Sequence, residues 1–187
     1  MAHLSAAPLQ FRYPFPTLIL SDWQIRSRCE GGMIHGYADE LINPASLDVR
    51  LGDTLLIESV VSRELVPYPL GGHTEANPYE LVPGQFCLAQ TVEVFNLPDD
   101  VAAQFMLKSS RAREGLEHLM AGYCDPGWHG SVLTLELHNS RQLWPVGLWP
   151  GMKIGQVVFH LMAERPLRSY AVTGRYNENA TVTASKG

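Results

Sequence analysis

The chain has 187 residues and a formal net charge of −5, which suits one domain with a single substantial core. An acidic balance argues against a broad nucleic-acid-binding surface, and no apolar run reaches the roughly 18 residues that a membrane span needs. The three cysteines lack CxxC spacing, which argues against a disulfide framework and a structural zinc site. The first twenty residues have no basic region followed by a continuous apolar stretch, so we expect no signal peptide and a cytoplasmic protein.

The first element in chain order is a short helix. Ser21 and Gln24 have the spacing of a capping box, in which the two residues satisfy each other's backbone donors. Gly31 and Gly32 provide a stop signal. The sequence therefore predicts one helix over about Asp22 to Glu30.

From Ala45 onward the apolar period changes to two, which is typical of strands. Leu47, Val49 and Leu51 alternate with polar residues and predict a half-buried strand. Further strands are predicted at Thr54–Val61, Gln85–Phe95, Ala102–Leu107, Ser131–His138 and Lys153–Leu161. Turn sequences rich in Pro and Gly separate these runs. Many short strands with one early helix predict a mainly β domain, a barrel or jelly-roll.

Residues 170–187 are polar and lose the strand period. Such a segment is either disordered or a lid that becomes ordered on a ligand. We expect a flexible C-terminal lid on a single domain that spans residues 1–187.

The run Lys108–Arg113 follows an apolar strand and contains three cations and two hydroxyls in six residues. Such groups neutralise and bind a phosphate chain. Spacing alone favours the alternative interpretation, in which the same run is a solvated basic turn.

Two further segments carry candidate chemistry. Asp125 begins an Asp-Pro-Gly turn and could accept a sugar hydroxyl while Tyr123 covers the ring, or it could simply stabilise its own turn. Glu136 lies between two leucines and shares one strand face with Thr134 and His138. A carboxylate at this position lies either on a wet sheet face or in a site that partners it.

Together these segments resemble the dCTP deaminase branch of the dUTPase-like superfamily. That branch carries the motifs K/R-S-S-x-[AG]-R, D-P-G-[FW]-x-G, T-L-E-L-x-N and P-G-M-x-I-G-Q. They correspond here to Lys108–Arg113, Asp125–Gly130, Thr134–Asn139 and Pro150–Gln156, with further similarity at Asn43–Gly52. The resemblance covers about residues 20–185. It implies a dUTPase-like distorted β-barrel or jelly-roll and a homotrimer with active sites between subunits.

The resemblance also implies an activity, the hydrolytic deamination of dCTP to dUTP and ammonia. Glu136 would be the general base on a water that attacks C4 of cytosine, and Ser109 and Arg113 would hold Glu136 and that water. Magnesium would be bound through the substrate triphosphate, with no zinc, and dUTP or dTTP would be further nucleotide ligands, the latter as an inhibitor. The implied substrate-binding residues are Lys108, Ser110, Arg111 and Gln156 at the phosphates, Asp125 at the 3′-hydroxyl, the backbone of Thr134 and Leu135 at the base, and Ala121, Tyr123, Tyr170, Arg175 and Asn179.

Three departures from the family pattern affect the site. Arg175 replaces a usual Lys, and Asn179 replaces a usual Gln and is one methylene shorter. The spacing from Asp125 to Glu136 is one residue longer than usual, which would turn Glu136 to the wrong face unless a bulge absorbs it. We predict that bulge between Gly130 and Leu133.

Several alternatives remain open from the sequence. A zinc deaminase needs H-x-E with a later P-C-x-x-C, and only His73-Thr74-Glu75 matches. A cupin-like metal site would have to combine His129, Glu136, His138 and His160 without an H-x-H motif. Glu136 argues against a plain dUTPase, whereas Ala121-Gly122-Tyr123 is typical of family members that also convert dUTP to dUMP. We expect a single-step deaminase, with the bifunctional enzyme and a non-catalytic nucleotide-binding relative as alternatives.

Overall fold

The computed structural model describes residues 19–187 of the chain. The expectation about a signal peptide concerns a segment that lies almost wholly outside these residues. Within them, every helix is too short or too polar to cross a membrane. The elements are α1 (Asp22–Glu30), β1 (Ile34–His35), η1 (Asp39–Leu41), β2 (Ile42–Asn43), β3 (Ser46–Arg50), β4 (Thr54–Ile57), β5 (Val66–Pro69), β6 (Tyr79–Leu81), β7 (Phe86–Asn96), β8 (Val101–Leu107), α2 (Ser109–Arg113), β9 (Leu116–His118), β10 (Tyr123–Cys124), β11 (His129–Asn139), β12 (Val146–Leu148), β13 (Lys153–Leu161) and α3 (Tyr170–Thr173).

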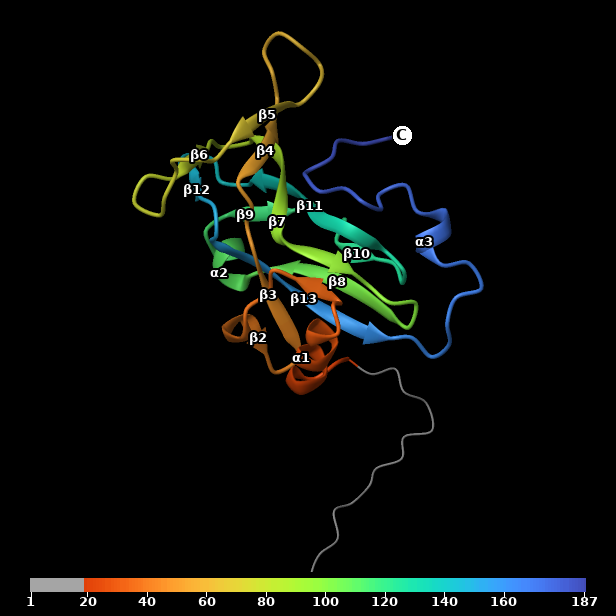
Figure 1. The fold of residues 1–187 in the computed structure, drawn as a ribbon. Coiled ribbons are helices and arrows are strands. Elements are labelled where there is room, and N and C mark those ends of the chain that lie inside the picture. The colour runs from red at the N-terminus through yellow and green to blue at the C-terminus, as the bar shows by residue number, and fades with distance from the viewer. Residues whose placement is uncertain (1–18) are drawn as a thin grey trace, which may run out of the picture.

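Two antiparallel sheets make up the body of the molecule (Figure 1). One has the strand order β5-β4-β7-β11-β9, with β1 paired to β7, and the other has the order β10-β8-β13-β3-β2. A small ribbon of β12 and β6 lies beside them. Residues of both sheets, such as Leu135, Leu137 and Phe159, share one buried core. The predicted mainly β, jelly-roll-like architecture is confirmed.

Helix α1 has the predicted bounds. The Gln24 side chain accepts a hydrogen bond from the Ser21 backbone N–H at 3.0 Å, as the capping-box spacing predicts. Ile25 and Cys29 are its buried residues. Arg28 fastens the helix to the turn before β8 through two hydrogen bonds to the Asp100 carboxylate, the shorter of them 2.8 Å.

Strand β3 differs from the half-buried strand that the alternation predicts. Ser46 and Asp48, on the face expected to be wet, are 7% and 3% exposed. The Lys108 ammonium lies 2.7 Å from each Asp48 carboxylate oxygen, and Gln156 accepts a hydrogen bond from Ser46. Both faces of β3 are therefore covered. The Asp48 carboxylate can be buried there because Lys108 is its partner cation.

Strand β4 ends at Ile57, four residues before the predicted end at Val61. Val60 and Val61 are exposed, and the Ser59 and Ser62 hydroxyls accept hydrogen bonds from backbone N–H groups two residues on. Serine side chains that bond to the nearby backbone favour turns over strands, which explains the early end.

The longest pairing, between β7 and β11, carries two irregularities. Gly130 is the extra residue between the His129–Asn96 and Ser131–Phe95 pairs. Further on, Thr91–Glu93 of β7 lie opposite Leu133, whose N–H donates to the Thr91 hydroxyl. The predicted bulge between Gly130 and Leu133 is confirmed, and a second irregularity lies on the partner strand.

Candidate functional site

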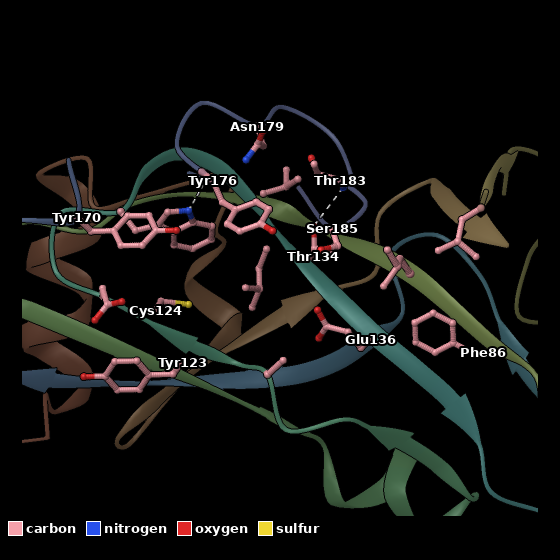
Figure 2. Close-up of a pocket in the computed structure, with 17 residues that line it drawn as sticks. Phe86, Tyr123, Cys124, Thr134, Glu136, Tyr170, Tyr176, Asn179, Thr183 and Ser185 are labelled. Atoms are coloured by element: carbon pink, nitrogen blue, oxygen red, sulfur yellow. Dashed lines mark hydrogen bonds between the residues drawn. The ribbon is translucent and has the colours of Figure 1, made fainter. Parts of the chain in front are cut away.

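A pocket of about 600 Å³ opens between β11, β10 and residues 170–187, which we call the C-terminal tail (Figure 2). In Figure 2 the tail runs along one side, Tyr123 and Cys124 lie on the other, and Glu136 projects from β11 between them. Seven predicted site residues line this pocket: Ala121, Tyr123, Asp125, Thr134, Glu136, Tyr170 and Asn179. The other lining residues are Leu65, Phe86, Leu88, Cys124, Trp128, Val132, Leu133, Tyr176, Thr183 and Ser185.

The Glu136 carboxylate lies partly in the pocket and partly against a neighbouring strand. Its side chain is 25% exposed, and its Oε2 lies 3.1 Å from Nε2 of His118, the last residue of β9. Both atoms are buried, and their geometry is not that of a hydrogen bond. Among residues 19–187 each therefore lacks a hydrogen-bond partner. The His118 ring is 5% exposed and packs against Phe105. Glu136 is thus held in a site rather than on a wet sheet face.

No motif singled out His118. It occupies the end of a three-residue strand, and only the pairing of β9 with β11 brings it to Glu136. A short apolar-polar segment such as Leu116–His118 gives no periodic signal long enough to assign a face.

Asp125 contributes its side chain to the pocket and its backbone to the turn. Its carbonyl accepts the Trp128 N–H at 3.2 Å, and Gly127 has the positive φ of 86° that this turn requires. Because the backbone closes the turn, the exposed Asp125 carboxylate is available to a ligand hydroxyl. Tyr123 is 60% exposed beside it.

Gly122 fits where no side chain would. A Cβ built there would lie 2.8 Å from the Phe105 Cβ and 2.9 Å from the Phe105 carbonyl oxygen. The Phe105 N–H also donates to the Gly122 carbonyl at 2.7 Å. This close approach of β10 to β8 sets the positions of Ala121 and Tyr123 in the pocket wall.

The C-terminal tail is docked on β11 and Trp128. The Tyr176 carbonyl accepts hydrogen bonds from the Trp128 indole and the Ser131 hydroxyl, both at 2.8 Å. Further along, the Val132 N–H donates to the Asn179 carbonyl at 3.0 Å. These three hydrogen bonds hold the tail against the pocket, which it lines with Tyr176, Asn179, Thr183 and Ser185.

The other predicted site residues lie outside the pocket of their own chain. Lys108 binds Asp48, Arg111 binds Glu114 and stacks on Trp149 at 5.6 Å, and Gln156 binds Ser46. The Leu135 side chain belongs to the core, so only its backbone could contact a base. Ser109, Ser110, Arg113 and Arg175 are exposed. Neither Ser109 nor Arg113 lines the pocket that contains Glu136 in this chain.

The histidines of the cupin-like alternative do not converge. His138 lies 3.6 Å from Glu117, the His129 Nδ1 is 2.9 Å from the Gly127 carbonyl, and His160 belongs to β13 of the other sheet. Residues 19–187 contain no group of three His, Cys, Asp or Glu side chains placed to hold one metal ion. That particular ligand set is therefore wrong.

Cys124 lines the pocket but is not activated. Burial raises the pKa of its thiol to about 12, and the nearby Asp125 charge acts in the same direction. A thiol with that pKa is protonated at neutral pH and is a poor nucleophile.

Comparisons with known proteins identify the family. A model of dCTP deaminase-like proteins matches residues 19–162. The chain belongs to the dCTP deaminase-like family. This match ends before the tail that lines one side of the pocket.

Similar proteins in the family carry a more specific name. A protein of Methanosphaerula palustris named "dCTP deaminase, dUMP-forming" is 41% identical over 183 residues, which cover 87% of this chain and 97% of that protein. Proteins with the same name in Rhodococcus opacus and Streptomyces coelicolor are 38% and 40% identical, over 90% of this chain and 96% and 95% of theirs.

A solved structure has the same fold. The 2′-deoxycytidine 5′-triphosphate deaminase from Agrobacterium tumefaciens superposes with a TM-score of 0.63 at 25% identity. The superposition covers 76% of this chain and 48% of that one, so the chain spans about half the length of the solved protein.

Proposed function

We propose that the chain hydrolyses the 4-amino group of dCTP and then converts the resulting dUTP to dUMP. The observation that carries the proposal is the Glu136 carboxylate in the wall of a nucleotide-sized pocket, with one oxygen buried and a quarter of the side chain exposed. The names of the relatives and the Ala121-Gly122-Tyr123 segment support the two-step reaction, which replaces the single-step deaminase as the favoured reading.

In the first step, water attacks C4 of cytosine. Glu136 takes one proton from the water as the C–O bond forms and then delivers a proton to the amino group. The C4–N4 bond breaks, ammonia leaves and dUTP remains. Backbone groups of Thr134 and Leu135, on the same strand as Glu136, are proposed to read the base edge.

In the second step, another water attacks the α-phosphorus of dUTP. The bond from that phosphorus to the bridging oxygen breaks, and dUMP and pyrophosphate are formed. Asp125 is proposed to hold the 3′-hydroxyl and Tyr123 to cover the sugar ring, so that the nucleotide keeps one position through both steps. Magnesium is proposed to be bound by the substrate's phosphates, where it would neutralise charge.

The triphosphate needs cations that this pocket lacks. Among the described residues that line it there is no Lys or Arg, although a triphosphate requires several positive groups. We therefore propose that a second copy supplies Ser109, Ser110, Arg111 and Arg113, in a homotrimer with shared sites. Lys108 and Gln156 are already engaged by Asp48 and Ser46, so they would have to bind phosphate from these positions or exchange partners.

The tail is proposed to act as the lid of the pocket. Tyr170, Tyr176 and Asn179 already lie on its rim. Arg175, between Tyr170 and Tyr176 in the tail, is exposed and is proposed to turn toward the phosphate groups of the nucleotide.

The test is a product analysis. The full chain is incubated with magnesium and dCTP, dUTP, dCDP or dCMP, and nucleotides, ammonia and pyrophosphate are quantified. We expect dCTP to give equal amounts of dUMP, ammonia and pyrophosphate. Accumulation of dUTP as the final product would overturn the second step, and dCTP binding without ammonia release would favour a non-catalytic relative. A zinc-specific chelator in a parallel reaction should leave the rate unchanged.

A further inference from the structure

We infer that Gln90 is a positioning residue that fastens the C-terminal tail over the pocket, and this inference rests on the function proposed above. Gln90 lies in β7 directly opposite Thr134 of β11. Residues opposite one another in an antiparallel pair share a face, so Gln90 is on the face that carries Thr134 and Glu136. Gln90 as a whole residue is 9% exposed.

The Gln90 side-chain carbonyl receives two hydrogen bonds from the tail. The Val182 backbone N–H donates to it at 2.7 Å, and the Thr181 hydroxyl donates at 2.9 Å. One residue further, the Thr183 N–H donates to the Thr134 hydroxyl at 3.3 Å. Three consecutive tail residues thus bind one β7–β11 residue pair, and we call this set of contacts the Gln90 clasp.

The surrounding backbone holds the Gln90 side chain in this position. A Cβ on Gly52 would lie 2.6 Å from the Gln90 Cγ and 3.2 Å from its amide nitrogen, so the turn after β3 packs closely on it. The Gly52 N–H also donates to the backbone carbonyl of Gln90 at 2.7 Å. An acceptor with so little freedom loses little entropy when it binds the tail.

The clasp places an apolar side chain at one end of the pocket. Val182 is 5% exposed and packs against Leu56 and Leu88, with Leu65 and Phe86 beside them. Leu65, Phe86 and Leu88 all line the pocket. The clasp therefore determines how deeply Val182 enters this cluster and where the neighbouring residues Asn179, Thr183 and Ser185 lie on the pocket rim.

The loss of the acceptor should weaken the clasp specifically. The buried Val182 N–H would then lack a partner on the protein, which strongly favours an open state in which water binds it, and the more exposed Thr181 hydroxyl would lose its hydrogen bond as well. The position of the tail should depend on the acceptor oxygen and much less on the size of the side chain.

The first test is hydrogen–deuterium exchange of the full chain without nucleotide. Gln90→Met keeps the length of the side chain and removes the acceptor, whereas Gln90→Glu keeps an acceptor at the same atom position. We expect exchange in the segment 176–187 to rise about tenfold in Gln90→Met, which corresponds to about 1.4 kcal/mol. Exchange in β13, which pairs with β3 and β8 and makes no hydrogen bond to the segment 176–187, should stay unchanged, and Gln90→Glu should retain most of the protection. Unchanged exchange in Gln90→Met, or equal loss in Gln90→Glu, would overturn the clasp.

A second variant keeps the test decisive if Gln90→Met does not fold. Thr181→Val removes one donor at an exposed position and leaves the core untouched. We expect it to raise exchange in the same segment by a smaller factor. Thr173→Val, in α3 outside the clasp, is the matched control and should leave the segment 176–187 unchanged. Equal exchange in Thr181→Val and the wild type would contradict the proposal.

The kinetic test separates this inference from the proposed function. In Gln90→Met the KM for dCTP should rise about tenfold with a smaller change in kcat, because closure and not proton transfer is weakened. Gln90→Glu should restore the KM. A loosened tail with an unchanged KM would overturn the positioning role. An inactive wild type would overturn the proposed function, while the exchange experiment would still decide whether the clasp exists.

Discussion

Glu136 combines two environments within one carboxylate. Oε2 is buried 3.1 Å from the His118 Nε2, while a quarter of the side chain remains exposed in the pocket. The neighbours Leu135 and Leu137 are buried in the core, so strand β11 fixes the face of the sheet from which the Glu136 side chain projects. A base held in this way loses little entropy when it engages a water molecule.

Replacement of Glu136 by Gln should abolish most of the turnover. The amide keeps the shape of the side chain but cannot accept the proton from the attacking water, so kcat for deamination should fall by about 10²- to 10⁴-fold. Binding of dCTP, measured by calorimetry, should change little. Glu117→Gln on the neighbouring strand β9, whose carboxylate is 58% exposed, is the control and should retain normal kcat. Turnover of Glu136→Gln within a few-fold of wild type would show that another group is the base.

At the scale of elements, the ion pair between Arg28 and Asp100 joins helix α1 to the turn before β8. The hydrogen bonds of Arg28 to Asp100 hold the pKa of this carboxyl below its ordinary value of 3.8, with burial acting against them. The pair therefore contributes stability above pH 3.8, and this contribution is lost as the pH falls below 3.8 through the folded-state pKa.

Asp100→Asn should reveal this pH dependence. Because both side chains are partly exposed, we expect the free energy of unfolding at pH 7 to fall by about 1 kcal/mol or less. The difference from wild type should shrink as the pH falls below 3.8. Urea denaturation at several pH values measures it, with Glu58→Gln in the exposed loop after β4 as the control. A difference that stays constant down to the lowest pH would contradict the ionic explanation.

The tail is the element whose removal should separate stability from activity. Deletion of residues 175–187 removes Val182 and exposes Leu56 and Leu88, against which it packs. This loss should lower the free energy of unfolding by about 1–3 kcal/mol and leave the two sheets intact. Turnover should fall roughly 10²-fold, because the nucleotide loses one side of its pocket and its precise position. Circular dichroism and steady-state kinetics on the same preparation test both effects. Normal kinetics after the deletion would mean that the tail is only a solvated end.

At the scale of the whole molecule, the proposed site needs more than one chain. The basic segment Lys108–Arg113 is separated from the pocket of its own chain, and no Lys or Arg is among the described lining residues. Exposed apolar side chains such as Met106 and Met120 lie on the strand and loop on either side of that segment. These features are consistent with burial between subunits.

Mixed assemblies provide the test. If Glu136 and Arg113 of one site come from different subunits, Glu136→Gln and Arg113→Ala chains refolded together at equal amounts should regain activity in about a quarter of the sites. Each variant alone should be inactive. Sedimentation should show a trimer at micromolar concentration. A monomer, or a mixture with no more activity than the separate variants, would contradict the shared site.

Much of the architecture and part of the site could be predicted because they depend on local patterns. Capping chemistry set the bounds of α1, and the two-residue period located most strands and placed Glu136 opposite the core-facing leucines. The motif spacing also predicted a bulge between Gly130 and Leu133, and the structure shows Gly130 as the extra residue before Glu136. The strand predicted through Val61 is wrong after Ile57, because the hydroxyls of Ser59 and Ser62 bond to the backbone and end β4 early.

Contacts between distant residues were decided only by the tertiary structure. Lys108 meets Asp48 across 60 positions and Gln90 meets Val182 across 92, while His118 reaches Glu136 only because β9 pairs with β11. A hydrophobic period reports which face of a strand is buried, but it carries no information about which strand or tail lies against that face. The sequence by itself therefore determined the elements and the catalytic candidate, whereas sheet pairing and tail docking decided which polar groups stand beside it.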